Sequence, residues 1–419
     1  MRIAVLGAGV VGLTTAYCLV DDGHEVVVID RGDGPAAGAS RANGAQLSFS
    51  YVAPLASPSV VAKLPELVLS RESPLRLYPQ LDPQLWSWCA RFLAACTRRQ
   101  AAETTVRLLA LSFFSRSILD ELIHREAIRF AHASNGKLVV YSDAESLASA
   151  AEQLEFQRTL GCEQELLDTD GCLAVEPALE HIRDRLTGGV FTRSDSAGDC
   201  RTFCEELAER IRRRSPASEF RFDTAIERFA LEGRRIRGVR TGAGLVEADA
   251  VVLALGSGSR RLARTAGFDL PIYPLKGYSI TVPAANDSGT PRVSVTDSAH
   301  KIVYARLGPM LRAAGIADLA GHDDAIDDAR LDLLVQRARA TFPGAGDYAD
   351  VRPWAGLRPA TPKGTPILGR SPVENLFLNI GHGALGFTLA AGAARVVADV
   401  VAGRTPALPL DGMTLVPNG

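Results

Sequence analysis

The sequence predicts an α/β dinucleotide-binding domain with Rossmann-like topology, interleaved with an α+β domain built on an antiparallel sheet. Two observations carry this prediction. Residues 2–30 read as strand, glycine turn, helix and strand, which is the order of a βαβ unit. Strand-like segments typical of an antiparallel sheet lie between this unit and a second glycine loop near the C-terminus. A chain of 419 residues is long for one core, so two domains are expected.

The βαβ unit begins with a short apolar strand at residues 2–6 and a glycine turn at residues 7–12. Gly7 allows the tight turn, Gly9 lets the backbone approach a pyrophosphate, and Gly12 lets the helix pack on the sheet. The helix at residues 11–20 then offers its N-terminal N–H groups to the phosphates.

The second strand, at residues 25–29, ends in Asp30. A carboxylate in this position can accept hydrogen bonds from ribose hydroxyls, and it disfavours a 2′-phosphate, which argues against NADP. The predicted dinucleotide contacts in this unit are Gly7, Gly9, Val10, Val11, Gly12, Asp30 and Arg31.

Hydrophobic periodicity predicts the remaining elements. Helices are expected at residues 85–95, 104–123, 144–161, 202–214, 325–340 and 387–402. Strands are expected at residues 137–141, 188–191, 220–222, 225–231, 236–240, 250–255 and 376–380, and an antiparallel sheet at residues 272–282, 293–295, 302–307 and 310–313.

The order of these elements predicts the domain boundaries, because the dinucleotide-binding elements occur at both ends and in the middle of the chain. Residues 1–50, 190–268 and 350–419 are predicted to form the dinucleotide-binding domain. Residues 51–189 and 269–349 are predicted to form the other domain.

Composition narrows the function classes. With 46 basic and 48 acidic residues the net charge is −2, which argues against a general nucleic-acid binder. The seven cysteines are unevenly spaced, so neither a disulfide framework nor a metal site is expected. We find no signal-peptide pattern and no run of about 18 uncharged apolar residues, and we expect a cytoplasmic protein without a membrane-spanning helix.

Five further motifs follow in order along the chain. They are Ser40–Ser48 with Tyr51 and Pro54, residues 273–278 (YPLKGY), residues 356–362 (GLRPATP), residues 365–369 (TPILG) and residues 381–388 (GHGALGFT). Together they resemble the FAD-dependent D-amino-acid oxidase superfamily, and most closely its bacterial D-amino-acid dehydrogenase branch. The βαβ unit alone does not distinguish NAD from FAD, and this resemblance implies FAD in a domain of the glutathione-reductase type.

The resemblance also implies where the flavin binds. One side of the site is implied at Ser40, Asn43, Gly44, Ala45, Gln46 and Leu47, and the far edge at Gly381, His382, Gly383, Gly386, Phe387 and Thr388. Gly256 and Arg358 are further predicted cofactor contacts. Physical chemistry supports the far edge, because a helix N-terminus there stabilises the negative charge that reduced flavin carries at N1 and C2=O. Relatives with covalent flavin use a cysteine near residues 358–366, and since none occurs here we expect non-covalent FAD.

Several side chains are candidates for the substrate site. Arg358 lies in an apolar segment, and superfamily members often hold the substrate carboxylate with an arginine of this motif; a structural ion pair is the alternative. Arg306 is a second candidate for this role. Three tyrosines are candidates for shaping the pocket: Tyr51, Tyr278 and Tyr304. His382 is a further candidate, although its backbone matters more than its ring if the reaction requires no general base. Sequence assigns no role to Lys276, nor to Lys363, which replaces an Asp of the family pattern.

The resemblance implies a reaction. A free amino acid, by resemblance the D-isomer, would transfer a hydride from its α-carbon to flavin N5, and the imino acid would hydrolyse to a 2-oxo acid and ammonia. The electrons would pass to quinone or another acceptor, with peripheral attachment to the inner membrane face left open. Alternatives are oxidation of glycine, proline, hydroxyproline or sarcosine-like secondary amines, an NAD-linked dehydrogenase, and a non-catalytic flavin-bearing partner subunit.

Overall fold

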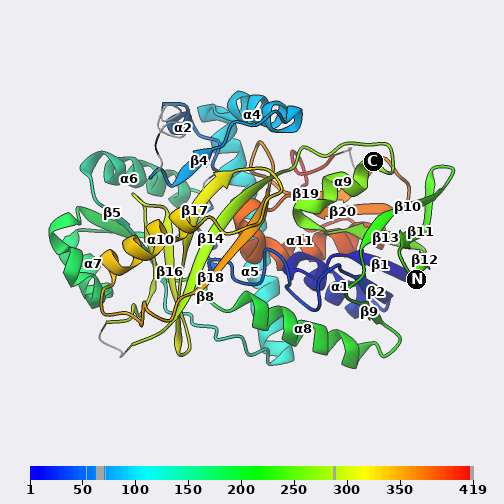
Figure 1. Cartoon of the computed structure of the whole chain (residues 1–419), viewed down its shortest axis with the longest axis horizontal. Coiled ribbons are helices and arrows are strands. Elements are labelled where there is room, and N and C mark those ends of the chain that lie inside the picture. The colour runs from blue at the N-terminus through cyan, green and yellow to red at the C-terminus, as the bar shows by residue number, and fades with distance from the viewer. Residues whose placement is uncertain (53, 63–69, 71, 286–288, 416–419) are drawn as a thin grey trace.

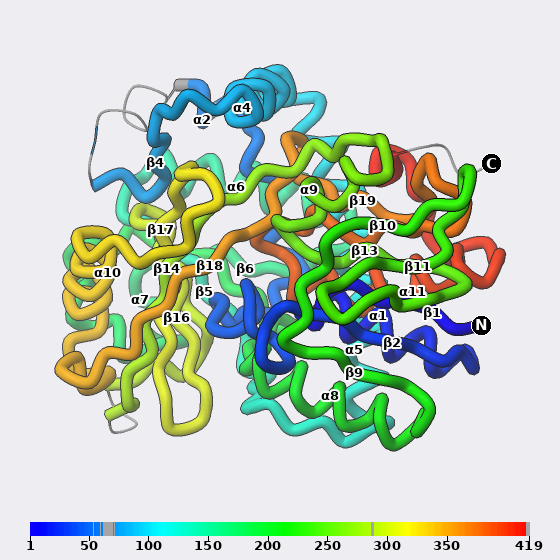
Figure 2. The backbone as a smooth tube through the Cα atoms, turned by 45° about the vertical axis from the view of Figure 1, so that its right-hand side comes forward, coloured from blue at the N-terminus to red at the C-terminus, as the bar shows by residue number. Residues whose placement is uncertain are grey.

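The computed structural model describes residues 1–52, 54–62, 70, 72–285 and 289–415. Two large sheets lie beside each other and are labelled in Figure 1, one around β1 and β13 and the other around β14 and β16. The long helices α5 (Arg98–Glu126) and α11 (Gly386–Val401) lie in the middle of the molecule. Figure 2 shows α2 (Pro58–Ala62) and α4 (Pro83–Ala95) standing over one end of the second sheet.

The first sheet has six strands, and five of them run parallel. Across the sheet the order is β19 (Ile367–Arg370), β20 (Leu376–Ile380), β13 (Ala250–Leu253), β1 (Arg2–Leu6), β2 (Glu25–Ile29) and β9 (Glu219–Arg221). The three central strands are almost entirely buried and rich in β-branched residues, as is typical of parallel strands that are covered on both faces.

Each face of the six-stranded sheet carries its own hydrophobic core. One face packs against α1 (Val10–Asp21), α8 (Cys200–Arg214), α5 and α11. The other face is covered by α9 (Ser259–Arg264) and by a three-stranded antiparallel sheet. That small sheet consists of β10 (Ile226–Glu232), β11 (Arg235–Thr241) and β12 (Gly244–Glu247).

The second sheet has nine strands and is largely antiparallel. Its order is β18 (Arg352–Ala360), β14 (Tyr273–Pro283), β17 (Met310–Leu319), β16 (Ile302–Leu307), β15 (Ser294–Asp297), β5 (Lys137–Tyr141), β7 (Gly188–Thr192) and β6 (Glu165–Leu167), with β4 (Leu75–Leu77) paired to β17. On one face lie α10 (Asp328–Thr341), α7 (Thr169–Val175) and the 3₁₀ helix at Pro177–Arg185. Two short strands, β3 (Gln46–Leu47) and β8 (Ser196–Ala197), form a separate pair, and α6 (Ala144–Arg158) packs near β5.

Most predicted elements are confirmed. Several short elements were not predicted, among them β4, β6, α7, β12 and α9. Two further differences concern long strands of the nine-stranded sheet. The strand predicted at residues 310–313 continues to Leu319 as β17, past a bulge that interrupts its alternation. Residues 352–360 form β18, a strand that the sequence did not predict, and it joins the nine-stranded sheet although residues 350–419 were assigned to the dinucleotide-binding domain. The domain boundaries themselves stay a prediction.

Among the described residues one helix, Gly383–Val401, is long and apolar enough by length and composition to cross a membrane. It contains Arg395 and Asp399, so it is not the uncharged apolar run of about 18 residues for which the sequence was searched. Two thirds of its apolar window (67 %) is buried inside the fold, where it packs against α1 and α5. Its hydrophobicity is therefore that of a core helix.

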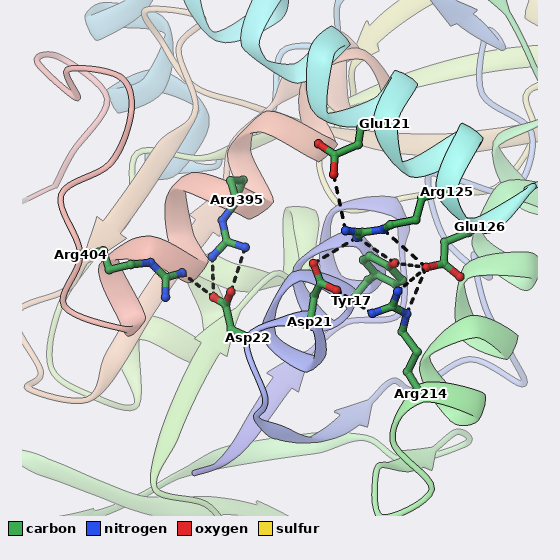
Figure 3. Close-up of polar contacts among 9 residues, drawn as sticks. All are labelled: Tyr17, Asp21, Asp22, Glu121, Arg125, Glu126, Arg214, Arg395 and Arg404. Carbon is green, nitrogen blue, oxygen red and sulfur yellow. Dashed lines mark hydrogen bonds and ion pairs between the residues drawn. The ribbon is translucent and has the colours of Figure 1, made fainter.

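A charged network fixes the C-terminal end of α1 to its neighbours (Figure 3). Asp22 accepts hydrogen bonds from Arg395 of α11 and from Arg404, each at 2.5 Å. Asp21 pairs with Arg125 and Arg214 of α5 and α8 at 3.1 and 2.6 Å. Burial opposes ionisation of Asp22, but its two arginine partners hold the pKa of this carboxyl below its ordinary value.

We expect Asp22→Asn to destabilise the fold by about 2 kcal/mol, between the values for exposed and buried ion pairs. Thermal and denaturant unfolding of the holoenzyme measure this. Because the folded-state pKa of Asp22 is lowered, its contribution is present at neutral pH and is lost as the pH falls through that pKa. Glu121→Gln is the matched control, since Glu121 pairs with Arg125 at the exposed rim and its loss should cost less than about 0.5 kcal/mol. Equal destabilisation by both changes would contradict the assignment.

Candidate active site

The glycine turn after β1 has no room for larger side chains. Gly7 has a φ angle of +111°, and a Cβ atom there would lie 2.5 Å from the Ala254 carbonyl oxygen. A Cβ atom on Gly12 would lie 1.9 Å from the Gly7 carbonyl oxygen. Helix α1 therefore starts directly against the end of β1. Gly9 at its N-cap has no side chain that could accept a hydrogen bond, and of the first-turn N–H groups the Val10 N–H has a described side-chain partner, Ser40. The turn therefore keeps N–H groups for an anion.

Asp30 and Ser40 complete this turn. The Asp30 carboxylate accepts hydrogen bonds from the N–H groups of Ala8 at 2.7 Å and Gly32 at 2.8 Å. Each of its oxygens keeps a second lone pair, which suits the predicted contact with ribose hydroxyls. Ser40 accepts a hydrogen bond from the Val10 N–H at 3.0 Å, so the loop that follows β2 returns to the start of α1. The neighbouring Arg31 is exposed.

The loop from Asn43 to Leu47 is anchored to the nine-stranded sheet. Gln46 donates to the Ser294 hydroxyl at 2.7 Å, and Arg312 donates to the Asn43 carbonyl at 3.1 Å. Gly44 packs so closely on β16 that a Cβ atom would lie 2.9 Å from a methyl group of Val303. This loop therefore lies where the two sheets meet.

The C-terminal glycine loop reaches the same place from the opposite end of the chain. Gly381 and Gly383 have φ angles of +80° and +55°, and α11 starts shortly afterwards without a side-chain cap. The Thr388 hydroxyl accepts a hydrogen bond from the Ser48 N–H at 3.2 Å, which joins this loop to the segment after Leu47. The Phe387 side chain instead packs on Phe130 and Phe203 in the helical core, so only its backbone is available to a ligand.

Four strands place these groups at one edge of the six-stranded sheet. Gly7 follows β1, Asp30 follows β2, Gly256 follows β13 and Gly381 follows β20, and these four strands are parallel. Ligands of open parallel sheets bind at this carboxyl edge. The uncapped starts of α1 and α11 and the close glycine contacts fit a dinucleotide that carries an anionic or electron-accepting ring, as FAD does.

Arg358 lies on β18 with its guanidinium stacked across Gly277 of β14, where a Cβ atom would lie 2.3 Å from it. It donates a hydrogen bond to the Ile316 carbonyl at 3.4 Å, and within the described residues it forms no ion pair with a carboxylate. Burial lowers the pKa of Arg358 to about 10, with the Asp318 charge opposing the shift. The side chain is therefore a cation at neutral pH, and the structural ion pair considered from the sequence is absent from this part of the chain.

A bulge in β17 aims a carbonyl at this arginine. Ile316 is the extra residue between the pairs Tyr278–Gly315 and Gly277–Ala317, and its φ angle is +53°. A β-branched residue in the left-handed region is strained, and such strain is concentrated at functional sites. The bulge thus brings the Ile316 carbonyl within reach of Arg358.

The opposite face of the nine-stranded sheet carries three of the predicted substrate-site residues, Tyr278, Tyr304 and Arg306. Tyr278 donates to the buried Asp318 at 3.0 Å, and Tyr304 donates to Thr341 of α10 at 3.2 Å. Both belong to the core beneath α10. Arg306 is two residues beyond Tyr304 on the same strand and therefore lies on the same face. Alternation along β16 turns these side chains away from Gly44, which contacts Val303.

Two lysines were left unassigned by the sequence. Lys276 donates to Asp323 and to the Ala325 carbonyl, both at 3.0 Å, so its ammonium has partners of its own. Lys363 is exposed on the turn between β18 and β19, two residues after Thr361, which packs against Gly381.

His382 and Tyr51 remain at the edge between the sheets. His382 is 3 % exposed, its Nε2 has no hydrogen-bond partner among the described residues, and burial lowers its pKa to about 4. It is therefore neutral at physiological pH. Its backbone forms a bridge with Ala360, two residues from Arg358, which ties the glycine loop to β18. Tyr51 is half-buried, and its ring centroid lies 4.0 Å from the Lys137 ammonium.

The sequence did not indicate Lys137 or Asp195, which lie beside Ser48 at the end of the first flavin motif. Lys137 is 1 % exposed and donates to the Ser48 hydroxyl at 2.9 Å, and Asp195 is fully buried beside the same segment. A lysine at the start of a strand is ordinarily exposed, so nothing in its sequence context marked it. Only the packing of β5 against the loop after Leu47 reveals the cluster.

Comparison with known proteins agrees with this geometry. Residues 2–400 match the family described as FAD dependent oxidoreductase. The chain is 49 % identical to D-amino acid dehydrogenase 2 of Ralstonia nicotianae, over 97 % of this chain and 98 % of that one. It is 42 % identical to a D-amino acid dehydrogenase of Paramagnetospirillum magneticum, over 99 % and 98 % of the two chains.

Solved structures show the same fold. Glycine oxidase from Bacillus cereus superposes with a TM-score of 0.75 at 18 % identity, covering 100 % of this chain and 99 % of that one. The site at the carboxyl edge of the parallel sheet defines a flavin-dependent oxidoreductase. The chain belongs to the FAD-dependent oxidoreductase family of the D-amino-acid oxidase type, and its cofactor is FAD.

We expect Gly12→Ala to abolish stable FAD binding, because the new Cβ atom would meet the Gly7 carbonyl at 1.9 Å and displace α1 from β1. The flavin content of purified protein and its visible absorbance measure this. Gly242→Ala is the control, since a Cβ atom there has no neighbour within 4 Å. A Gly12→Ala protein with full flavin content would contradict the proposed pyrophosphate turn.

Proposed function

We propose that this protein is an FAD-dependent D-amino acid dehydrogenase, which oxidises a free D-amino acid to the 2-oxo acid and ammonia. The relatives at 42–49 % identity over nearly full length carry that activity in their names, which supports the substrate class and the handedness. The observation that carries the proposal is Arg358, a half-buried cation without a described carboxylate partner beside the loop of His382. A free amino acid brings the carboxylate that this guanidinium lacks.

FAD, when bound, supplies the acceptor for the hydride that leaves the substrate α-carbon. The chain's own groups provide position and charge. Arg358 would hold the substrate carboxylate through two parallel hydrogen bonds, which fixes the α-carbon and accounts for much of the rate. The Ile316 carbonyl limits the rotation of the guanidinium.

The groups around the far edge of the site contribute charge stabilisation rather than acid–base catalysis. The uncapped N-terminus of α11 directs its positive dipole end towards the carboxyl edge of the sheet. His382 stays neutral over the physiological range, because its pKa of about 4 lies far below it. The amine would therefore have to react in its neutral form without a proton transfer to His382.

The proposed cofactor contacts are the backbone of residues 7–12, Asp30, residues 40–47, Gly256 and residues 381–388. We infer an electron acceptor other than oxygen, such as a quinone, because the relatives are named dehydrogenases. A cytoplasmic protein agrees with the seven free cysteines of the described chain. Peripheral attachment to the inner membrane face would bring such a protein to its quinone.

Anaerobic mixing of the wild-type holoenzyme with matched D- and L-amino acids tests the function. We expect D-isomers to bleach the absorbance of the oxidised flavin and L-isomers to leave that absorbance unchanged. We expect a quinone analogue to reoxidise the reduced flavin, and so restore its colour, faster than air does. Glycine, proline, hydroxyproline and sarcosine belong in the panel. Bleaching by L-isomers or by secondary amines alone would overturn the handedness or the substrate class. Bound FAD that no amino acid bleaches would favour a non-catalytic partner subunit.

Replacing Arg358 tests the carboxylate clamp. We expect Arg358→Leu to weaken the apparent affinity for the amino acid by about 10- to 100-fold, the value of a charge-assisted hydrogen-bonded pair, and Arg358→Lys to weaken it less. Stopped-flow flavin reduction over a range of substrate concentrations separates this affinity from the limiting rate. Arg306→Leu is the matched control, because it removes an arginine from the opposite face of the sheet. An unchanged affinity in Arg358→Leu would refute the clamp.

A further inference from the structure

A buried polar cluster lies directly behind the loop proposed to bind the flavin. Lys137, the first residue of β5, is 1 % exposed and donates to the Ser48 hydroxyl at 2.9 Å. Its ammonium also lies over the ring of Tyr51 at 4.0 Å. Asp195 is fully buried and accepts a hydrogen bond from the Phe49 N–H at 2.8 Å through Oδ1, while its Oδ2 has no described partner.

The cluster lies on the sheet face that carries the flavin loop. Lys137 pairs in register with Ser294 of β15, and Ser294 accepts the hydrogen bond from Gln46 of that loop. Ser48, the partner of Lys137, also donates its N–H to Thr388 in the first turn of α11. Lys137 is thus linked through one intervening residue, Ser48, to the start of α11, and through Ser294 to Gln46. Both segments are proposed to contact the flavin.

Both charges lie next to the loop that is proposed to bind the flavin. Lys137 donates to Ser48, the residue after Leu47. Asp195 accepts from the Phe49 N–H, and it directly precedes β8, whose Ser196 pairs with Leu47. Loss of the Lys137 charge would therefore make the potential at this loop more negative.

Stability does not explain this pair. Burial lowers the pKa of Lys137 to about 8, although Asp195 opposes the shift. Burial also raises the pKa of Asp195 to about 6, although Lys137, the neighbouring backbone N–H groups and Arg116 oppose the shift. Each shift moves its group towards the neutral form, so keeping both charged at neutral pH costs folding free energy. Perturbed groups of this kind cluster at functional sites.

Other titratable groups surround the pair. Tyr51 and Tyr141 face it with pKa values that burial raises, and Cys162 approaches Asp195 through Ser50. A cavity of about 380 Å³ is lined by Ser50, Arg116 and Ser194 among others, and it brings solvent to the residues next to Asp195. Protons can therefore reach the pair from the surface.

We propose that Lys137, held by its hydrogen bond to Ser48 and with Asp195 as a neighbouring charge, is a positioning cation that stabilises the negative charge gained by the bound FAD on reduction. The proposal rests on the flavin placement given above. A hydride brings two electrons and one proton, so the cofactor gains one net negative charge, and a fixed cation beside it favours that state. Removing the cation should make the flavin harder to reduce.

The experiment measures the midpoint potential of FAD in the holoenzyme during anaerobic titration with dithionite and a reference dye. We expect Lys137→Met to lower the two-electron potential by at least about 30 mV, which corresponds to a tenfold loss of preference for reduced FAD. Lys137→Arg should retain most of the potential, because the charge is kept. Lys276→Met is the matched control, since it removes an equally buried lysine from the opposite face of the sheet.

An unchanged potential in Lys137→Met, or an equal fall in Lys276→Met, would overturn the proposal. If Lys137→Met does not hold FAD, the wild-type potential measured against pH decides. The midpoint potential should fall more steeply with pH above about pH 8, because Lys137 then loses its proton. Lys137→Arg should show no such change of slope. A wild type without this change of slope would overturn the proposal as well. Dithionite needs no amino acid, so this outcome is independent of the proposed substrate.

Discussion

Parallel pairing of β1 with β2 and β13, and of β13 with β20, is the constraint on which the rest of the structure depends. Parallel strands end at the same edge, so segments more than three hundred residues apart in sequence meet there. The helices that follow β1 and β20 both begin at that edge and run away from it side by side. The ion pairs of Asp22 with Arg395 and Arg404 then hold their far ends together.

The nine-stranded sheet places a cation, Arg358, beside the carboxyl edge of the parallel sheet. The backbone bridge between Ala360 and His382 fixes β18 against the glycine loop, and Arg358 lies two residues earlier. The bulge at Ile316 adds one residue to β17 and so shifts the alternation of its side chains. The Ile316 carbonyl meets Arg358, while the Asp318 side chain still faces α10 and pairs with Arg330. Because of this one extra residue, Asp318 has a structural partner and does not form an ion pair with Arg358.

Local signals allowed the sequence to predict the glycine turn, Asp30 and the C-terminal loop, because each depends on residues close in the chain. The strand β18 could not be predicted, since Pro353, Gly356 and Pro359 resemble a loop. Proline is tolerated there because β18 is the terminal strand of its sheet and pairs only with β14. The position of Tyr278 and Tyr304 beneath α10 could not be predicted for a related reason. The face on which a strand residue lies depends on register and bulges, which composition does not report.

The cations near the two sheets divide into two groups by their partners. Arg330 pairs with the buried Asp318 at 2.8 Å, and Arg312 pairs with Asp199 at 3.4 Å, so each has a carboxylate within the fold. The half-buried Arg358 has only a carbonyl at 3.4 Å, and the buried Lys137 has a hydroxyl and an aromatic ring, with Asp195 as a neighbouring charge. Removing such cations from water costs folding free energy that no ion pair among the described residues offsets. A bound anion would offset it, and the substrate carboxylate and the reduced cofactor are the two anions proposed to lie at this edge of the sheet.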